Sequence, residues 1–169
     1  MCTGSGVAPF RSFVHERATQ RLAGAKLGPT LVFFGCRSRH NDFLYKEEWE
    51  RFSSPGQGDL LSGDLDVLKT GTVGGGEGGS EPFFVAAFSR DGPEKDYVTH
   101  RIRRDACRVW GMISAGAHVF VAGSSGKMPE DVLEAFKDVA CQIGGMEPAE
   151  AKKFFARMDA QGRYTVEAW

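Results

Sequence analysis

Short apolar segments alternate with segments of helical spacing along this chain, and this alternation constrains the fold most. Residues 30–34, 82–88 and 118–122 are apolar runs with the length of buried strands. Residues 163–167 have the composition of a closing strand. Strands that alternate with helices form a parallel sheet with helices on both faces. The sequence therefore predicts an α/β fold with a doubly wound parallel sheet.

Helical spacing is found at about 9–23 and at 42–52, 98–114, 129–143 and 148–160. Three of these segments begin with a proline, which suits a first helical position because its missing N–H would have no partner there. Between residues 53 and 81 the pattern stops, and nine of the 22 glycines of the chain fall there. We expect one domain over 1–169, with a flexible glycine-rich insertion at about 53–81.

Composition excludes several classes of protein. The chain has 21 basic and 22 acidic residues and a net charge of -1, so it is not a typical nucleic-acid-binding protein. Its apolar runs are too short to span a membrane. Its four cysteines lack the spacing of metal ligands, so we expect no metal site. Widely spaced cysteines in a domain of this size suit reduced thiols, and therefore a cytoplasmic location.

Ligands of open α/β sheets bind beyond the carboxyl ends of the strands. Gly4, Ser5 and Gly6 precede the first helix, where glycines and unpaired helical N–H groups can hold a phosphate. A glycine-rich helix cap without a ligand has the same pattern. Ser89 and Arg90 follow a strand, with Lys95 and Tyr97 a short turn later, and together they suit a phosphomonoester beside an adenine. A solvated basic turn is an equal alternative for this segment.

A hydrolase is a weaker alternative. The loop Gly123-Ser124-Ser125-Gly126 is one residue short of a nucleophile elbow, with Ser125 as the candidate nucleophile.

Five motifs occur in order along the chain: GSGVAPF at 4–10, FGCR at 34–37, AFSR at 87–90, KDYV at 95–98 and GRYTVEAW at 162–169. Together they resemble the NADPH-binding C-terminal domain of the diflavin reductases, in the ferredoxin–NADP reductase superfamily. The resemblance implies a Rossmann-like NADP-binding fold. It also implies hydride transfer from NADPH to FAD, and onward through FMN.

Site roles follow from the resemblance residue by residue. It implies that Trp169 covers the flavin ring of FAD and that the Glu167 carboxylate steadies the nicotinamide, and we take both as catalytic. The residues it implies for coenzyme binding are Gly4, Ser5, Gly6, Cys36, Arg37, Ser89, Arg90, Lys95, Asp96, Tyr97, Val98, Thr99, Gly123, Met128 and Asp131. Thr99 stands where the family usually has Gln.

The loop at 122–129 most resembles the NADPH-dependent diflavin oxidoreductases of cytosolic iron–sulfur assembly, which implies an anamorsin-type iron–sulfur protein as electron acceptor. Relatives have a strand directly before the glycine loop, whereas only three residues precede Gly4 here. We therefore expect the first strand and the FAD and FMN domains to be missing, the chain to be truncated, and the fragment to be inactive alone. A non-catalytic nucleotide-binding or interaction module is the alternative.

Overall fold

A computed structural model describes residues 1–52 and 83–169, and the predicted insertion at 53–81 lies outside them. Its sheet has five strands in the order β3-β2-β1-β4-β5, and every pairing is parallel. The strands are β1 (Cys2–Thr3), β2 (Val32–Cys36), β3 (Phe84–Phe88), β4 (Val119–Gly123) and β5 (Tyr164–Ala168). The prediction of a parallel α/β sheet of the Rossmann type is confirmed.

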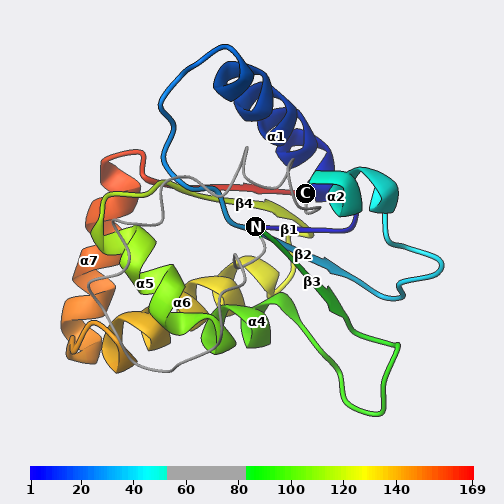
Figure 1. Ribbon diagram of the computed structural model, residues 1–169. Helices are drawn as coiled ribbons and strands as arrows, with labels where there is room; N and C mark the ends of the chain where they lie inside the picture. Colours follow the sequence, from blue (N-terminus) through cyan, green and yellow to red (C-terminus); the bar gives the residue numbers. More distant parts are fainter. Residues whose placement is uncertain (53–82) are drawn as a thin grey trace, which may run out of the picture.

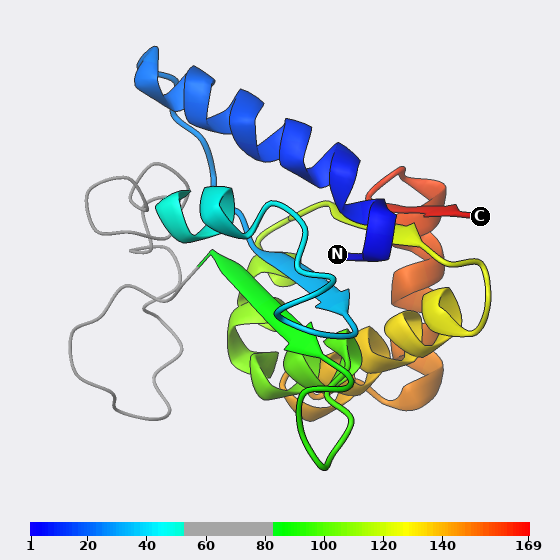
Figure 2. The same ribbon diagram turned by 90° about the vertical axis from the view of Figure 1, so that its right-hand side faces the viewer.

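Helices cover both faces of this sheet, as Figures 1 and 2 show. A 3-10 turn at Gly4–Gly6 leads into α1, and α1 and α2 lie on one face while the remaining helices lie on the other. The helices are α1 (Val7–Leu22), α2 (Lys46–Phe52), α4 (Val98–Arg104), α5 (Ala106–Ser114), α6 (Met128–Gln142) and α7 (Pro148–Ala160). Within the two described ranges, no helix is both long enough and apolar enough to cross a membrane.

The core divides into two clusters because the sheet separates two layers of helices. Buried side chains of α1 and α2, among them Val14 and Trp49, pack with Phe34 on one face. On the other face, Ile102 and Val139 of α4 and α6 pack against Phe33. Consecutive residues of β2 thus serve opposite clusters, as strand geometry requires. Burial on both faces explains why the strand sequences are continuously apolar.

The expectation that the first strand is missing is wrong. Cys2 and Thr3 form β1 in the centre of the sheet, where Cys2 pairs with Phe34 of β2 and Ala122 of β4. Met1 extends this contact, because the Ala122 N–H donates to its carbonyl at 3.0 Å. Two residues form a strand here because neighbours on both sides satisfy their backbone groups.

Two predicted helices have different bounds in the structure. The helix expected over 98–114 is divided at Asp105, whose φ of -91° and ψ of 25° lie outside helical values. The helix expected from residue 42 begins only at Lys46, directly after Tyr45, whose φ is 57°. A left-handed residue cannot continue a right-handed helix, so α2 starts behind it.

Candidate functional site

A cavity of about 770 Å³ lies at the carboxyl ends of the strands. All five strands deliver a residue to it at or just beyond their last position: Ser5 after β1, Arg37 after β2, Ser89 after β3, Ser124 after β4 and Trp169 after β5. Residues at the starts of α4 and α6 complete the wall. This is the place where open parallel sheets bind their ligands.

Most of the predicted site residues line this cavity. The structure brings together Gly4, Ser5, Cys36, Arg37, Ser89, Asp96, Tyr97, Val98, Thr99, Gly123, Met128, Asp131 and Trp169. Four predicted residues do not line it: Gly6, Arg90, Lys95 and Glu167. Sequence reasoning missed four others that do: Thr3, Gly35, Asp42 and Ser124.

The glycine loop has one open and one crowded glycine. Gly4 has a φ of 54°, and a Cβ placed on it would meet nothing within 4 Å, so its backbone is accessible from the cavity. Gly6 is buried, and a Cβ there would stand 2.5 Å from the carbonyl oxygen of Ala122. Gly4 therefore suits approach by a ligand, whereas Gly6 permits the start of α1 to lie against β4.

Backbone hydrogen bonds hold the loops after β2 and β3 together. The Ser89 N–H donates to the Cys36 carbonyl at 3.0 Å, and the Arg90 N–H donates to the Arg37 carbonyl at 2.8 Å. The Arg39 N–H donates to the Asp91 carboxylate at 2.7 Å, which lowers the pKa of Asp91. These bonds hold the backbone of Arg90 beside that of Arg37, but of the two residues only Arg37 lines the cavity.

An ion-pair cluster around Asp96 fixes the opposite wall. Arg101 donates to Asp96 Oδ2 through Nε at 2.7 Å and through Nη2 at 2.5 Å, and Arg104 Nη1 lies 3.8 Å from Oδ1. The Tyr97 N–H donates to Nδ1 of His100 at 3.2 Å. The segment that carries Tyr97 is therefore tied to the first turns of α4, and Tyr97 itself is 44% exposed. Its ring lies 5.5 Å from the His100 ring, centroid to centroid, and lines the cavity.

The last residue of the chain is bound at both backbone ends to the loop after β4. The Trp169 N–H donates to the Gly123 carbonyl at 3.1 Å, and the Ser125 N–H donates to the Trp169 carbonyl at 3.0 Å. The Trp169 side chain is 60% exposed and lines the cavity. Glu167 pairs with Ala122 across the sheet and is exposed outside the cavity.

Neither the Cys36 thiol nor the Ser125 hydroxyl has the surroundings of a nucleophile in the described part of the chain. Burial and the nearby carboxylates Asp42 and Asp91 raise the pKa of Cys36 to about 11, so its thiol stays protonated at neutral pH. Ser125 does not line the cavity, and no hydrogen bond in the described part of the chain joins its hydroxyl to a histidine. A serine nucleophile needs such a base.

Residues 1–70 match the family described as the oxidoreductase NAD-binding domain. The cavity lies where a Rossmann topology places its ligand, at the end of β1 and along the 3-10 turn that precedes α1.

Two relatives are similar to this chain over nearly its whole length. The chain is 42% identical over 167 residues to NADPH-dependent diflavin oxidoreductase 1 of Arabidopsis thaliana, covering 98% of this chain and 24% of that protein. It is 34% identical over 166 residues to NADPH–cytochrome P450 reductase of Homo sapiens, covering 98% of this chain and 21% of that one. The resemblance to diflavin reductases is confirmed, and the chain spans about a quarter or less of these relatives.

Proposed function

We propose that this chain is an NAD-binding domain that holds NADPH in the cavity at the strand ends and, within a larger flavoprotein, presents it for hydride transfer to FAD. The observation that carries the proposal is the convergence on one cavity of predicted site residues from all five strand ends, with coenzyme residues from four of them and Trp169 from the fifth. The similarity to two kinds of NADPH-dependent flavoprotein reductase supports the choice of coenzyme.

The residues of the cavity suit a dinucleotide phosphate. Gly4 leaves its backbone open, and the N-terminal turns before α1 offer N–H groups and a favourable dipole for a pyrophosphate. Arg37 and Ser89 at the cavity, with Arg90 and Lys95 near its rim, supply positive charge and a hydroxyl for a 2′-phosphate. The exposed ring of Tyr97 suits contact with the adenosine.

Trp169 and Glu167 have the remaining roles in the proposal. NADPH, when bound, supplies the hydride. Trp169 covers the place where flavin and nicotinamide meet, and its exposed ring can turn aside. Glu167 does not line the cavity, so we assign its carboxylate a longer-range electrostatic effect on the nicotinamide rather than a contact.

The wider function is inferred from the relatives. We propose that the chain is a fragment of a diflavin reductase whose FAD and FMN domains pass electrons to an anamorsin-type iron–sulfur protein. Identity is higher to the diflavin oxidoreductase, at 42%, than to the human P450 reductase, at 34%. The four cysteines are all free, which supports a reducing, cytoplasmic location.

Calorimetric titration with 2′,5′-ADP and with 5′-AMP tests the coenzyme assignment. Hydrogen bonds to charged groups contribute about 1.5–3 kcal/mol, so Arg90→Ala and Lys95→Ala should each weaken binding of 2′,5′-ADP by roughly 10- to 100-fold. Binding of 5′-AMP should change little, because it lacks the 2′-phosphate. Lys152→Ala, which removes an exposed lysine of α7, is the matched control. Equal affinity of the parent for both nucleotides would remove NADPH from the proposal.

A chimera tests hydride transfer. The chain replaces the matching segment of the Arabidopsis diflavin oxidoreductase, and FAD reduction by NADPH is followed by the loss of flavin absorbance. Reduction in the chimera supports the proposal. NADPH binding without reduction would instead support a non-catalytic nucleotide-binding module.

A further inference from the structure

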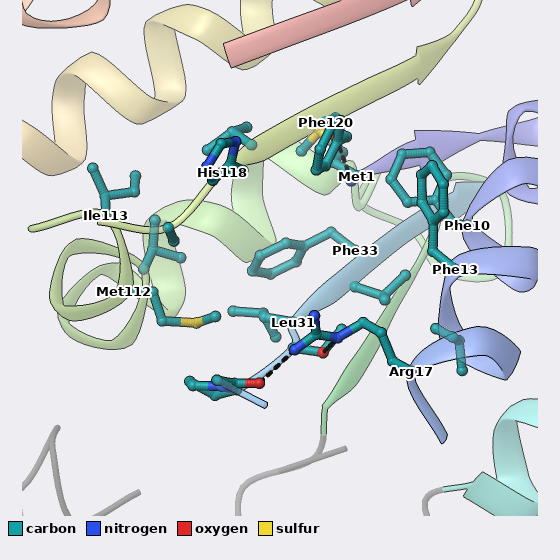
Figure 3. A pocket seen from close by; sticks show the side chains of 18 of the residues that line it. Met1, Phe10, Phe13, Arg17, Leu31, Phe33, Met112, Ile113, His118 and Phe120 are labelled. Atoms are coloured by element: carbon teal, nitrogen blue, oxygen red, sulfur yellow. Dashed lines mark hydrogen bonds between the residues drawn. The ribbon is translucent and has the colours of Figure 1, made fainter. Parts of the chain in front are cut away.

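Two cavities at opposite edges of the sheet have different surfaces. One, of about 590 Å³, lies at the amino ends of β2 and β4 and is lined mainly by apolar side chains, such as Phe33 and Met112 in Figure 3. Arg17, which also lines it, already donates to Thr30 Oγ1 at 2.7 Å. In the cavity at the carboxyl ends, by contrast, the hydroxyl of Thr3 has no hydrogen-bond partner among the described residues. An unpaired donor therefore lies in the cavity to which the coenzyme is assigned.

Thr3 is the last residue of β1, the central strand of the sheet. It pairs with Gly35 of β2, and the pairing of Cys2 with Ala122 places it level with Gly123 of β4. Thr3 and both glycines line the cavity. Because glycine has no side chain, Thr3 supplies the only side chain of the three central strands at this level. The floor of the cavity is thus bare backbone on either side of one threonine.

The two glycines show how the Thr3 side chain is turned. A Cβ placed on Gly123 would stand against Thr3 Oγ1, and a Cβ placed on Gly35 would stand 3.3 Å from Thr3 Cγ2. The hydroxyl therefore lies toward β4, and the methyl group lies toward β2. Ser89 lines the cavity beyond β2, at the end of β3, whereas Trp169 lines it beyond β4, at the end of β5. The hydroxyl thus faces the half of the cavity that the proposed function gives to the nicotinamide.

The Thr3 hydroxyl is not used by the turn that follows it. Thr3 is the N-cap of the 3-10 turn Gly4–Gly6, with φ -132° and ψ 140°, and its side chain makes no capping hydrogen bond. A threonine in an N-cap position ordinarily accepts a hydrogen bond from an N–H of the turn. Thr3 Oγ1 is also absent from the fully enclosed, unpaired polar atoms of the described residues, which are Asp96 Oδ1, Arg163 Nε and Tyr164 Oη. The hydroxyl is therefore accessible to a ligand in the cavity.

The side chains beside Thr3 limit what the hydroxyl can serve. A Cβ on Gly35 would stand 2.9 Å from Val98 Cγ1, at the start of α4. A Cβ on Gly123 would stand 3.2 Å from Met128 Cε, at the start of α6. Both neighbours are apolar, so the polar group between them is the hydroxyl of Thr3. A ligand that lies over this floor meets one hydrogen-bond donor there.

The position of Thr3 selects the part of the coenzyme above it. A dinucleotide that reaches from Ser89 to Trp169 crosses the end of β1, and its diphosphate forms the middle of the molecule. A hydroxyl that donates to a phosphate oxygen forms a charge-assisted hydrogen bond, which is stronger than a bond between neutral groups. Because Oγ1 lies on the β4 side, the phosphate it reaches is the one that carries the nicotinamide ribose.

We propose that Thr3 is a further coenzyme-binding residue, whose hydroxyl donates a hydrogen bond to the nicotinamide-side phosphate of the coenzyme. The inference rests on the proposed function and deepens it, because it assigns a side chain of β1 itself to the diphosphate, in addition to the loop Gly4–Gly6. Thr3 thereby fixes the place at which the coenzyme crosses the sheet.

Calorimetric titration of Thr3→Val and Thr3→Ser with three nucleotides tests the inference. NADP⁺ and 2′-phospho-ADP-ribose both contain the nicotinamide-side phosphate, and 2′,5′-ADP lacks it. Thr3→Val keeps the shape of the side chain and removes the hydroxyl, so it should weaken binding of the first two nucleotides by about tenfold or more and leave 2′,5′-ADP unchanged. Thr3→Ser keeps the hydroxyl and should bind all three like the parent. Thr165→Val is the matched control, because Thr165 lies in β5 and does not line the cavity.

Three results would overturn the assignment of Thr3. They are unchanged affinities in Thr3→Val, an equal loss for 2′,5′-ADP, which would move the contact to the adenosine half, and a loss for NADP⁺ alone, which would move it to the nicotinamide. Thr3→Ala, which also lacks the hydroxyl, replaces Thr3→Val in each comparison if the valine variant does not unfold cooperatively. A parent that binds 2′,5′-ADP no better than 5′-AMP removes the proposed function and this inference together. A parent that keeps that preference, with unchanged affinities in Thr3→Val, removes this inference alone.

Discussion

Replacing Gly6 by Ala separates the entropy of the unfolded chain from close packing in the folded one. Gly6 is the N-cap of α1, with φ -59° and ψ -7°, values that alanine adopts without strain. The lower conformational entropy of the unfolded alanine chain alone predicts a gain of up to about 1 kcal/mol. The added Cβ, however, would lie 2.5 Å from the Ala122 oxygen and 2.9 Å from the Gly123 nitrogen. These are backbone atoms, so no rotamer change relieves the clash.

The magnitude follows from the distances. Ordinary contact begins at 3.4 Å, so α1 must withdraw from β4 by about 0.9 Å, the difference from 2.5 Å. Overpacking costs about 1–3 kcal/mol, and a clash with rigid backbone atoms lies at the upper end of that range, at about 2–3 kcal/mol. After a gain of about 1 kcal/mol from the unfolded chain, a net loss of about 1–2 kcal/mol remains. In a chain of this length Tm should fall by roughly 2–8 °C. Affinity for 2′,5′-ADP should fall with it, because Gly4 and Ser5 move with the helix.

Gly28→Ala is the control for this prediction. A Cβ on Gly28 meets nothing within 4 Å, and its φ lies outside the left-handed region, so alanine there should stabilise by about 0.4–1 kcal/mol. Chemical denaturation of both variants, followed by circular dichroism, measures the difference. A Gly6→Ala chain as stable as the parent, with unchanged nucleotide affinity, would refute the packing argument.

Two further predictions concern pH. Hydrogen bonds from Arg11 and His15 lower the pKa of Glu48 to about 2, so its contribution to stability is present above pH 4.5 and is lost as the pH falls toward 2. In Glu48→Gln, the urea midpoint of unfolding should depend less on pH over that range than in the parent, whereas Glu47→Gln should leave this dependence unchanged. Equal pH profiles for the two variants would contradict the prediction. The Met1 amino group binds a proton less readily in the folded chain than in the unfolded chain, because burial lowers its pKa to about 6. The free energy of unfolding should therefore rise with pH between pH 6 and 8. N-terminal acetylation should remove that part of the rise, and an unchanged slope would count against burial of the charge.

The strands and helices away from β1 could be predicted because each is long enough to carry its own pattern. β1 could not, because Cys2 and Thr3 are too few to show a period, and their strand geometry comes from β2 and β4 on either side. The break at Asp105 was equally hidden, since helical spacing continues on both sides of it. Tertiary pairing decided the first case, and a local change of backbone angles decided the second.

For the site, the sequence predicted which segments converge better than which side chains enter the cavity. Ser89 and Arg90 are neighbours at one strand end, yet only Ser89 lines the cavity. Side-chain direction at a loop depends on hydrogen bonds such as Arg90 N–H to Arg37, which no motif encodes. Thr3 was missed because it belongs to the strand that the sequence did not reveal.

Because both backbone ends of Trp169 are bonded to the Gly123–Ser125 loop, its ring can change its place in the cavity wall only by rotation about its own side-chain bonds. Such rotations in exposed residues take picoseconds to nanoseconds, whereas loop and domain movements are slower by orders of magnitude. The part of the cavity wall formed by Trp169 can therefore change shape while the backbone around it stays in place.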